Sequence, residues 1–209
     1  MQRITAVIFD LGGVLVTVDF DRMWARITGL AAEGVRPEAL MDTDLMTRWC
    51  TGRIPPDEFR RIVCGRNGLD MDLDRFSEWW SDLFDVMPGM EDLIADVTAV
   101  MPVGLLSDTD PIHWPCLRDR HAFLRAIPLP TLSFQTGFLK PSREAFLTAA
   151  DHVGSPPGQC LFVDDVERNV AAAREAGMTA VRFTGAADLR AAMEDLGLPL
   201  AGRRDRDRG

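Results

Sequence analysis

Five short runs rich in Val, Ile, Leu and Phe stand out along the chain and predict buried β-strands. Their apolar residues are mostly continuous rather than alternating, a pattern that suits strands covered by helices on both faces of a parallel sheet. The runs are residues 6–9, 103–106, 131–134, 160–163 and 180–183. Between the later runs, helical patterns cover residues 88–100, 141–152 and 167–176. This alternation of strands and helices predicts an α/β fold with a doubly wound, Rossmann-like parallel sheet.

Residues 20–87 break this rhythm and show no convincing strand pattern. They contain four amphipathic segments separated by Gly and Pro, at residues 21–30, 37–50, 56–64 and 73–84. We therefore predict a small all-α module inserted after the first strand, with its aromatic side chains forming its own core. The predicted division is a core domain of residues 1–17 and 88–200, a helical cap of residues 18–87, and a disordered charged tail at 201–209.

Composition narrows the class of protein. The chain has 209 residues, is 46% hydrophobic and carries a formal charge of −9, which argues against a nucleic-acid or membrane surface because both favour clustered Lys and Arg. No apolar run approaches the ~18 residues of a membrane span, and we predict no signal peptide. The four cysteines lie far apart without metal-ligand spacing, so we expect reduced thiols in a cytoplasmic protein.

Acidic residues follow three of the predicted strands. Asp10 ends the first, Ser107 and Asp108 end the second, and a pair of aspartates ends the fourth. Parallel strands bring their carboxyl ends to one edge, where open α/β sheets bind ligands. Two carboxylates 4 Å apart repel by about 4 kcal/mol at an effective dielectric near 20, so the cluster needs a cation. Oxygen ligands of this kind suit Mg²⁺, and Lys140 is the expected protein cation beside an anionic group.

The same residues resemble the four motifs of the haloacid dehalogenase-like (HAD) hydrolase superfamily. The matching strings, in order, are FDLGGVL at 9–15, LSD at 106–108, GFLKP at 137–141, and FVDD at 162–165 with Asn169. Their order, their spacing and the helical insert at the type-1 cap position extend the resemblance over nearly the whole chain. The variants most resemble the bacterial α-D-glucose-1-phosphatase-like branch.

This resemblance implies a Mg²⁺-dependent phosphomonoesterase acting on a small sugar or metabolite phosphate. Asp10 would be the nucleophile that forms an aspartyl-phosphate, and such covalent capture divides one difficult step into two easier ones. The implied Mg²⁺ ligands are the carboxylates of Asp10 and Asp165 and the carbonyl of Gly12, with Asp164 binding directly or through water. The metal would offset repulsion between the anionic nucleophile and the anionic substrate.

The resemblance also implies a phosphate-binding set of Ser107, Asp108 and Lys140. Lys140 would in addition pair with Asp10 and keep it ionised and aimed. Asn169 would support the site by orienting Lys140 or the turn of the fourth motif. Trp24, Arg48 and Trp49 are candidates for contact with the substrate. Cap residues of this kind would set specificity.

Two positions depart from the pattern of the superfamily. Gly12 stands where most of its phosphatases have an aspartate that protonates the leaving oxygen, a contribution worth typically 10²–10⁴ in rate. A glycine supplies no proton, so the reaction needs a good leaving group or another acid, for which Asp19 and Asp108 are candidates. Asp108 itself stands where the resembled branch usually has asparagine, and its charge should weaken phosphate binding unless it is paired or protonated.

These departures keep two other functions open. One is a catalytically impaired HAD-like protein with a binding or regulatory role, which Gly12 and Asp108 favour. The other is a 2-haloacid dehalogenase, which needs no metal; the two aspartates of the fourth motif disfavour it. After the second motif come His113, Arg118 and Arg120, which could lie at the rim of the site or on the surface; we expect a solvated helix face.

Overall fold

The computed structural model describes residues 3–22, 25, 42–128 and 130–200. Its centre is a five-stranded parallel sheet with the strand order β5-β4-β1-β6-β7. The strands are β1 (Ala6–Phe9), β4 (Val103–Ser107), β5 (Pro130–Leu132), β6 (Cys160–Asp164) and β7 (Thr179–Arg182). Because β1 pairs with both β4 and β6, the carboxyl ends of these three strands lie side by side at one edge of the sheet.

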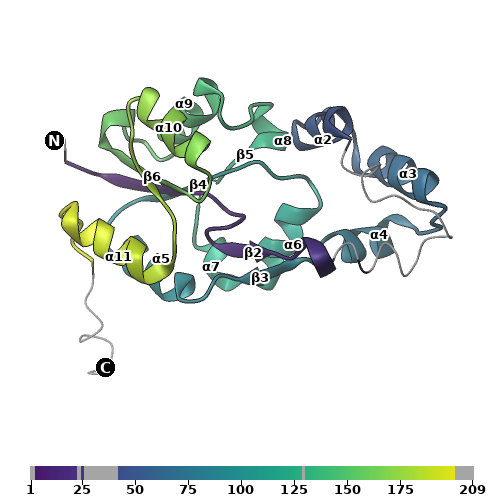
Figure 1. Cartoon of the computed structure of the whole chain (residues 1–209), viewed down its shortest axis with the longest axis horizontal. Helices are drawn as coiled ribbons and strands as arrows, with labels where there is room; N and C mark the ends of the chain where they lie inside the picture. The colour runs from purple at the N-terminus through teal and green to yellow at the C-terminus, as the bar shows by residue number, and fades with distance from the viewer. Residues whose placement is uncertain (1–2, 23–24, 26–41, 129, 201–209) are drawn as a thin grey trace.

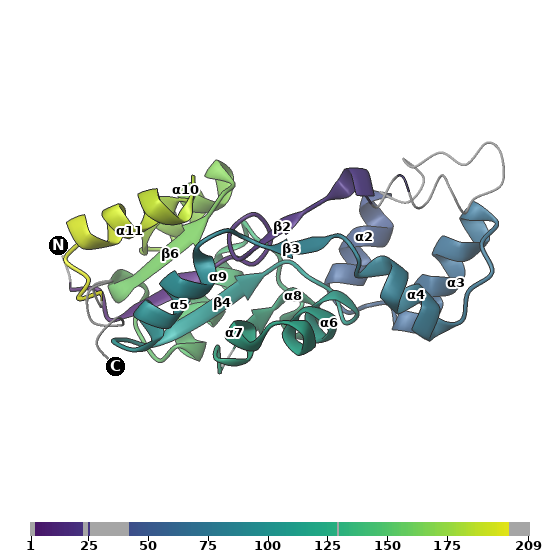
Figure 2. The ribbon, with the colours of Figure 1, turned by 90° about the horizontal axis from the view of Figure 1, so that it is seen from below.

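Helices cover both faces of this sheet (Figures 1 and 2). On one face lie α5 (Met90–Thr98), α6 (His113–Arg120), α7 (Ala122–Arg125) and α11 (Ala186–Asp195). On the other lie α9 (Arg143–His152) and α10 (Glu167–Glu175). A short helix, α8 (Ser133–Thr136), follows β5, and a 3₁₀ turn, η2 (Pro157–Gln159), precedes β6.

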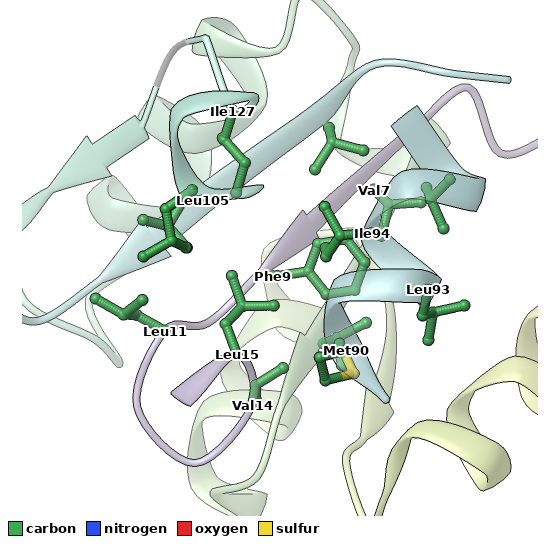
Figure 3. Close-up of a cluster of buried hydrophobic side chains, with 14 of the residues drawn as sticks. Val7, Phe9, Leu11, Val14, Leu15, Met90, Leu93, Ile94, Leu105 and Ile127 are labelled. Atoms are coloured by element: carbon green, nitrogen blue, oxygen red, sulfur yellow. The ribbon is translucent and has the colours of Figure 1, made fainter. Parts of the chain in front are cut away.

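Successive side chains of β1 supply the two cores. Val7 and Phe9 belong to a cluster that includes Leu93 and Ile94 of α5 (Figure 3). Ala6 and Ile8 belong to a second cluster with the apolar faces of α9 and α10. Each residue of β1 is fully buried, as expected of a central strand whose side chains alternate between two covered faces.

A two-stranded antiparallel ribbon leads out of the sheet domain and back. It pairs β2 (Val16–Val18) with β3 (Phe84–Val86). Between these strands lies what we call the helical insert, whose described helices are α2 (Thr43–Cys50), α3 (Pro56–Asn67) and α4 (Leu73–Trp80). Aspartate side chains cap two of these helices, since Asp42 accepts from the amides that open α2 and Asp72 from that of Arg75 in α4.

Aromatic rings build the core of the helical insert. Trp49 stacks on Phe59 with ring centres 4.1 Å apart, and Phe76 stacks on Trp80 at 5.8 Å. The insert contacts the sheet domain closely at Gly52, where a side chain is excluded because a Cβ would lie 2.2 Å from the carbonyl oxygen of Phe134. No helix in the described ranges is long and apolar enough to cross a membrane.

The structure confirms the predicted doubly wound parallel sheet, with all five strands close to their expected positions. Three details differ. The strand expected over 131–134 ends at Leu132, where α8 begins. The helix expected over 73–84 ends at Trp80, and the expectation of no strand in 20–87 is wrong because β3 begins at Phe84. The helix expected over 21–30 lies mostly outside the described residues, as does the tail 201–209.

Candidate active site

A pocket of about 440 Å³ opens at the carboxyl ends of β1, β4 and β6. Seven of the eight site residues expected from the sequence line it, namely Asp10, Gly12, Ser107, Asp108, Lys140, Asp165 and Asn169. The eighth, Asp164, is completely buried and touches the site through Lys140 and Asn169. The strand ends therefore bring together residues that are up to 159 positions apart in the sequence.

The loop after β1 places Asp10 at the pocket. The carboxylate Oδ1 of Asp10 accepts a hydrogen bond from the amide of Leu11 at 2.7 Å, and the amide of Gly13 donates to the carbonyl of Val16 at 2.8 Å. Gly13 has a φ of +79°, and a Cβ at this position would lie 2.4 Å from Oδ2 of Asp165. The positive φ favours glycine here, and any larger residue would also have to displace the side chain of Asp165 at the end of β6.

Lys140 is the only lysine in the sequence, and its side chain is 3% exposed. Its Nζ lies 2.6 Å from Oδ1 of Asp10 and donates to Oδ2 of Asp164 at 2.9 Å. Its backbone amide donates to Oδ1 of Asp108 at 3.0 Å. Burial alone would lower the pKa of Lys140, but the surrounding carboxylates raise it above its ordinary value, so the side chain stays charged.

Asn169 holds the aspartate beneath the pocket. Its Nδ2 donates to both oxygens of Asp164 at 3.1 Å, and the amide of Val166 donates to Oδ1 of the same carboxylate at 2.8 Å. Of the two roles expected for Asn169, the structure thus shows contact with the turn of the fourth motif, while its link to Lys140 runs through Asp164. The Oδ1 of Asn169 is buried and has no hydrogen-bond partner among the described residues.

The electrostatics of the pocket favour a divalent cation. Asp10, Asp164 and Asp165 each offer one carboxylate oxygen, and these three atoms lie within 4.8 Å of one another. Burial raises the pKa of Asp10 and of Asp165, and the charge of Asp164 raises both further. One lysine cannot neutralise three carboxylates. Their hard oxygen ligands match the preference of Mg²⁺, so the residues present fit this metal.

The end of β4 and the loop after it place Ser107 and Asp108 in the pocket, and a side chain from α8 supports this loop. Ser107 is the last residue of β4 and is buried. Two residues later, the amide of Thr109 donates to Oγ of Ser133, whose hydroxyl donates back to the carbonyl of Thr109, both at 3.0 Å. This reciprocal pair fixes the backbone beside the candidate phosphate-binding residues.

The same loop is tied to the helical insert by a buried acid. Asp110 Oδ2 lies 2.7 Å from Nδ1 of His113 and accepts from the indole of Trp80 in α4 at 3.1 Å. Its Oδ1 accepts from the amides of Ile112 and His113 at 2.8 and 2.7 Å. Burial would raise the pKa of Asp110, but the charge of His113 and these hydrogen bonds together lower it below its ordinary value. This network joins the helical insert to the loop after β4, which starts at the pocket.

Some expectations for single residues are wrong. Trp49, a candidate for substrate contact, is fully buried in the core of the helical insert. Arg48, by contrast, is exposed beside Asp44 at 3.9 Å, and its contact with the substrate stays a prediction. His113 does not lie on a solvated face, because its ring stacks on Trp80 with centres 5.4 Å apart and its Nε2 lies 2.9 Å from the carbonyl of that residue. Trp24 lies outside the described residues.

The pocket also contains residues that sequence reasoning missed. Gly13, Val18, Phe20, Val166 and Arg168 complete its lining. Phe20 and Val166 are exposed apolar side chains at 48% and 40%, respectively. Arg168 lies within the fourth motif, and its position one residue before Asn169 is the signal that could have found it. A second overlooked signal points to Lys140: it is the only lysine in the sequence, and every other basic residue apart from the histidines is arginine.

Comparisons with known proteins agree with this arrangement. A family model described as haloacid dehalogenase-like hydrolase matches residues 4–177. The chain is 28% identical over 197 residues to D-ribitol-5-phosphate phosphatase of Bacteroides thetaiotaomicron, covering 88% of this chain and 94% of that protein. It is also 28% identical over 132 residues to flavin mononucleotide hydrolase 1 of Arabidopsis thaliana, covering 63% of this chain and 54% of that one.

Solved structures show the same fold. A HAD family enzyme from Bacteroides thetaiotaomicron, in complex with magnesium and inorganic phosphate, aligns with a TM-score of 0.78 at 24% identity over 87% of this chain and 95% of that chain. A 2-haloacid dehalogenase from Pseudomonas syringae aligns with a TM-score of 0.65 at 17% identity over 86% of each chain. At such identities these likenesses establish the architecture alone.

Proposed function

This chain belongs to the haloacid dehalogenase-like hydrolase family, and from that premise we propose that it is a Mg²⁺-dependent phosphomonoesterase acting on a small sugar or metabolite phosphate. The observation that carries the proposal is the surrounding of Asp10. Its Oδ1 lies 2.6 Å from Nζ of Lys140, and the carboxylate belongs to a three-aspartate cluster at the bottom of an open pocket. A single lysine beside several carboxylates suits the binding of a dianion together with a divalent metal.

Asp10 would act as the nucleophile. One of its carboxylate oxygens would attack the phosphorus, the bond to the leaving oxygen would break, and an aspartyl-phosphate would form, which water then hydrolyses. Lys140 and the amide of Leu11 hold the attacking carboxylate in one orientation. Mg²⁺, held by Asp10, Asp165, the carbonyl of Gly12 and Asp164, would supply positive charge that stabilises the equatorial oxygens of the transferring phosphoryl group.

The phosphate would lie between β1 and β4. Ser107 can donate its hydroxyl to a phosphate oxygen, and the ammonium of Lys140 adds a charge-assisted hydrogen bond. Asp108 lines the same space but carries the wrong charge for an anion, so its role cannot be simple attraction. Asn169 would act indirectly. It holds the carboxylate of Asp164 in place, and that carboxylate in turn orients Lys140.

The named relatives support a small phosphate monoester as substrate, since one is a phosphatase of a phosphorylated sugar alcohol and the other a hydrolase of flavin mononucleotide. We propose that residues 18–87 act as a cap over a core of residues 1–17 and 88–200. Specificity would then come from residues at the pocket mouth, such as Phe20 at the end of the ribbon. We expect a small-molecule partner and a cytoplasmic location.

A second candidate function is that of a catalytically impaired relative that binds phosphorylated ligands. The observation in its favour is Gly12, which lines the pocket without a proton-carrying side chain. A 2-haloacid dehalogenase is disfavoured because a substrate carboxylate would join three acidic side chains without the metal that offsets them.

The test is a phosphate-release screen across sugar phosphates, sugar-alcohol phosphates and nucleotides, with and without Mg²⁺. We expect turnover that requires the metal and disappears in Asp10→Asn. Asp151→Asn, an exposed aspartate of α9, is the matched control and should match the wild type. Binding of inorganic phosphate without release from any substrate would favour the impaired relative, and chloride release from 2-chloropropionate would favour the dehalogenase.

A further inference from the structure

We propose that Asp108 is the catalytic acid and base of this enzyme and takes the place of the carboxyl group that Gly12 lacks. The inference rests on the proposed phosphatase function and names the residue that handles the proton. When an alkyl phosphomonoester is cleaved, its alcohol part leaves as a basic alkoxide. Protonation of the leaving oxygen in the transition state therefore typically accelerates the reaction 10²–10⁴-fold. The pocket must therefore supply a proton from some side chain.

Few groups in the pocket can carry that proton. Within the described lining, carboxyl groups belong only to Asp10, Asp108 and Asp165. Asp10 is the nucleophile, and Asp165 belongs to the carboxylate cluster that would bind the metal. Asp108 is therefore the carboxyl group of this set that is neither the nucleophile nor a proposed metal ligand.

The placement of Asp108 suits proton transfer. It follows Ser107 directly at the end of β4, so it lies next to the candidate phosphate-binding residue, and it is exposed where it lines the pocket. Its Oδ1 accepts from the amide of Lys140 at 3.0 Å, which fixes the side chain. Among the described residues nothing donates to its Oδ2, and this oxygen is left to carry a proton.

The electrostatic surroundings keep a proton on Asp108 at higher pH than on an ordinary aspartate. Although the side chain is open to the pocket, the protein on its other sides desolvates it, and this effect raises its pKa. The charged or titratable groups that face it are Lys140, Asp164 of β6, Arg168 of α10 and Cys50 of α2. A protonated Asp108 is neutral and would no longer repel the phosphate. The same proton would be available for transfer to the leaving oxygen.

Asp19, the other candidate acid from the sequence, forms an ion pair with Arg22. Its Oδ1 accepts from the amide of Arg22 at 2.8 Å, and its Oδ2 lies 3.3 Å from Nε of the same arginine. It lines an adjoining hollow beside the β2–β3 ribbon, which shares Val18 and Phe20 with the pocket of Asp10, but Asp19 does not line that pocket itself. Its carboxylate would have to break the ion pair and turn away from Arg22 to act.

The proposed step balances over one turnover. An oxygen of Asp10 bonds to phosphorus while the bond from phosphorus to the leaving oxygen breaks, and the proton of Asp108 goes to that oxygen to give the alcohol. Water then attacks the phosphorus, its proton goes to the Asp108 carboxylate, and the bond to Asp10 breaks. The products are the alcohol and inorganic phosphate, and both aspartates return to their first state.

Asp108→Asn tests the assignment, because the amide oxygen can still accept from Lys140 while the proton is lost. The probes are p-nitrophenyl phosphate, phenyl phosphate and D-ribitol 5-phosphate, whose leaving groups become progressively more basic. Because all three probes give the same aspartyl-phosphate, loss of the base slows its hydrolysis equally for each of them. The acid is therefore read from kcat/KM, which reports the step that releases the leaving group. We expect kcat/KM to fall about 10²–10⁴-fold for the alkyl phosphate, less for phenyl phosphate, and little for p-nitrophenyl phosphate, whose leaving group needs no proton. The limb of the pH profile that requires the protonated acid should disappear with it.

Substitutions of two further aspartates serve as controls. Asp119→Asn, an exposed aspartate of α6, should match the wild type, as should Asp19→Asn. Thermal unfolding and inhibition by inorganic phosphate should show that Asp108→Asn is folded and retains its phosphate site. An equal loss of kcat/KM with all three probes, or a gain in kcat/KM with all three together with tighter phosphate binding, would overturn the proposal. A dependence on leaving-group basicity that appears in Asp19→Asn instead would move the role to Asp19. Absence of phosphate release by the wild-type enzyme from every probe would reject the phosphatase function itself.

Discussion

The Nζ of Lys140 lies 2.6 Å from Oδ1 of Asp10, and both side chains are nearly excluded from solvent. This contact joins the loop after α8 to the end of β1 across the pocket. The same ammonium reaches Asp164 at 2.9 Å, so one cation holds two acids from neighbouring strands. Much of the balance of charge in the site depends on it.

Lys140→Met should therefore cost both stability and activity. Removing one partner of a buried ion pair leaves uncompensated charge and destabilises by about 3–5 kcal/mol. We expect a loss of this order in the free energy of urea-induced unfolding, together with loss of turnover. Lys140→Arg should not restore activity, because the planar guanidinium differs from a compact ammonium in shape. A Lys140→Met enzyme with wild-type stability would show that the carboxylates tolerate its absence.

Mg²⁺ should stabilise the folded protein even without substrate. A ligand at one hundred times its dissociation constant contributes about 2.7 kcal/mol, and here it would also relieve the repulsion that raises the pKa of Asp10 and Asp165. We expect the melting temperature to rise with Mg²⁺ in the wild type and in Asp151→Asn, and not in Asp165→Asn. Removal of the metal with a chelator should reverse the rise. An equal rise in Asp165→Asn would place the metal elsewhere.

Gly13→Ala should damage the pocket more than an equivalent change at another glycine. Both Gly13 and Gly154 have positive φ, at +79° and +68°, which costs alanine about 1–2 kcal/mol. At Gly13 a Cβ would collide with Asp165, whereas at Gly154 it would meet no atom of the described residues within 4 Å. We expect Gly13→Ala alone to lose the rise in melting temperature caused by Mg²⁺. Equal effects of the two variants on stability and on the metal response would contradict this packing.

The buried acid Asp110 should make stability depend on pH in a defined direction. Its pKa is lowered in the folded state, so its contribution is complete above the ordinary aspartate pKa of about 4 and is lost as the pH falls through the lower folded-state value. Asp110→Asn should be destabilised near neutral pH, and the difference from the wild type should shrink at acid pH. Unfolding in urea across this range measures it, with Asp119→Asn as control. A difference that stays constant would mean that the charge contributes nothing.

The two tryptophans at the end of α4 provide a matched pair. The indole of Trp80 donates to Asp110 at 3.1 Å, while that of Trp79 is buried without a hydrogen-bond partner in the part of the chain that the structure describes. A hydrogen bond to a charged group contributes about 1.5–3 kcal/mol, and replacement by Phe removes a similar volume at each site. We expect Trp80→Phe to be destabilised by this amount more than Trp79→Phe in urea unfolding. Equal losses would show that the bond adds no net stability.

The sequence predicted the central sheet well because its strands are short, apolar and buried on both faces. β1 occupies the expected residues 6–9, and β6 extends the expected run by only one residue, to Asp164. The ribbon escaped notice because β2 and β3 have three residues each and their stability comes from pairing with each other. Such pairing over more than sixty positions leaves no local periodicity to detect.

The site was predictable where chemistry depends on residue type and order, and less so where it depends on packing. Aspartates at strand ends led to the pocket, because parallel strands place those ends together. His113 escaped because its ring is buried by Trp80 and Phe84, partners that no spacing along the chain reveals. The packing role of Gly13 was not predictable, because Asp165 lies beside it only in the folded chain.

The presence of a single lysine gives this enzyme a built-in probe. Labelling with ¹⁵N-lysine would introduce one side-chain amine signal into the whole NMR spectrum, and that signal would come from the centre of the pocket. Its chemical shift and its rate of hydrogen exchange would report on the proposed metal loading, phosphate binding and covalent capture on Asp10 without any substitution. The chemistry of the site can thus be observed in the unaltered protein.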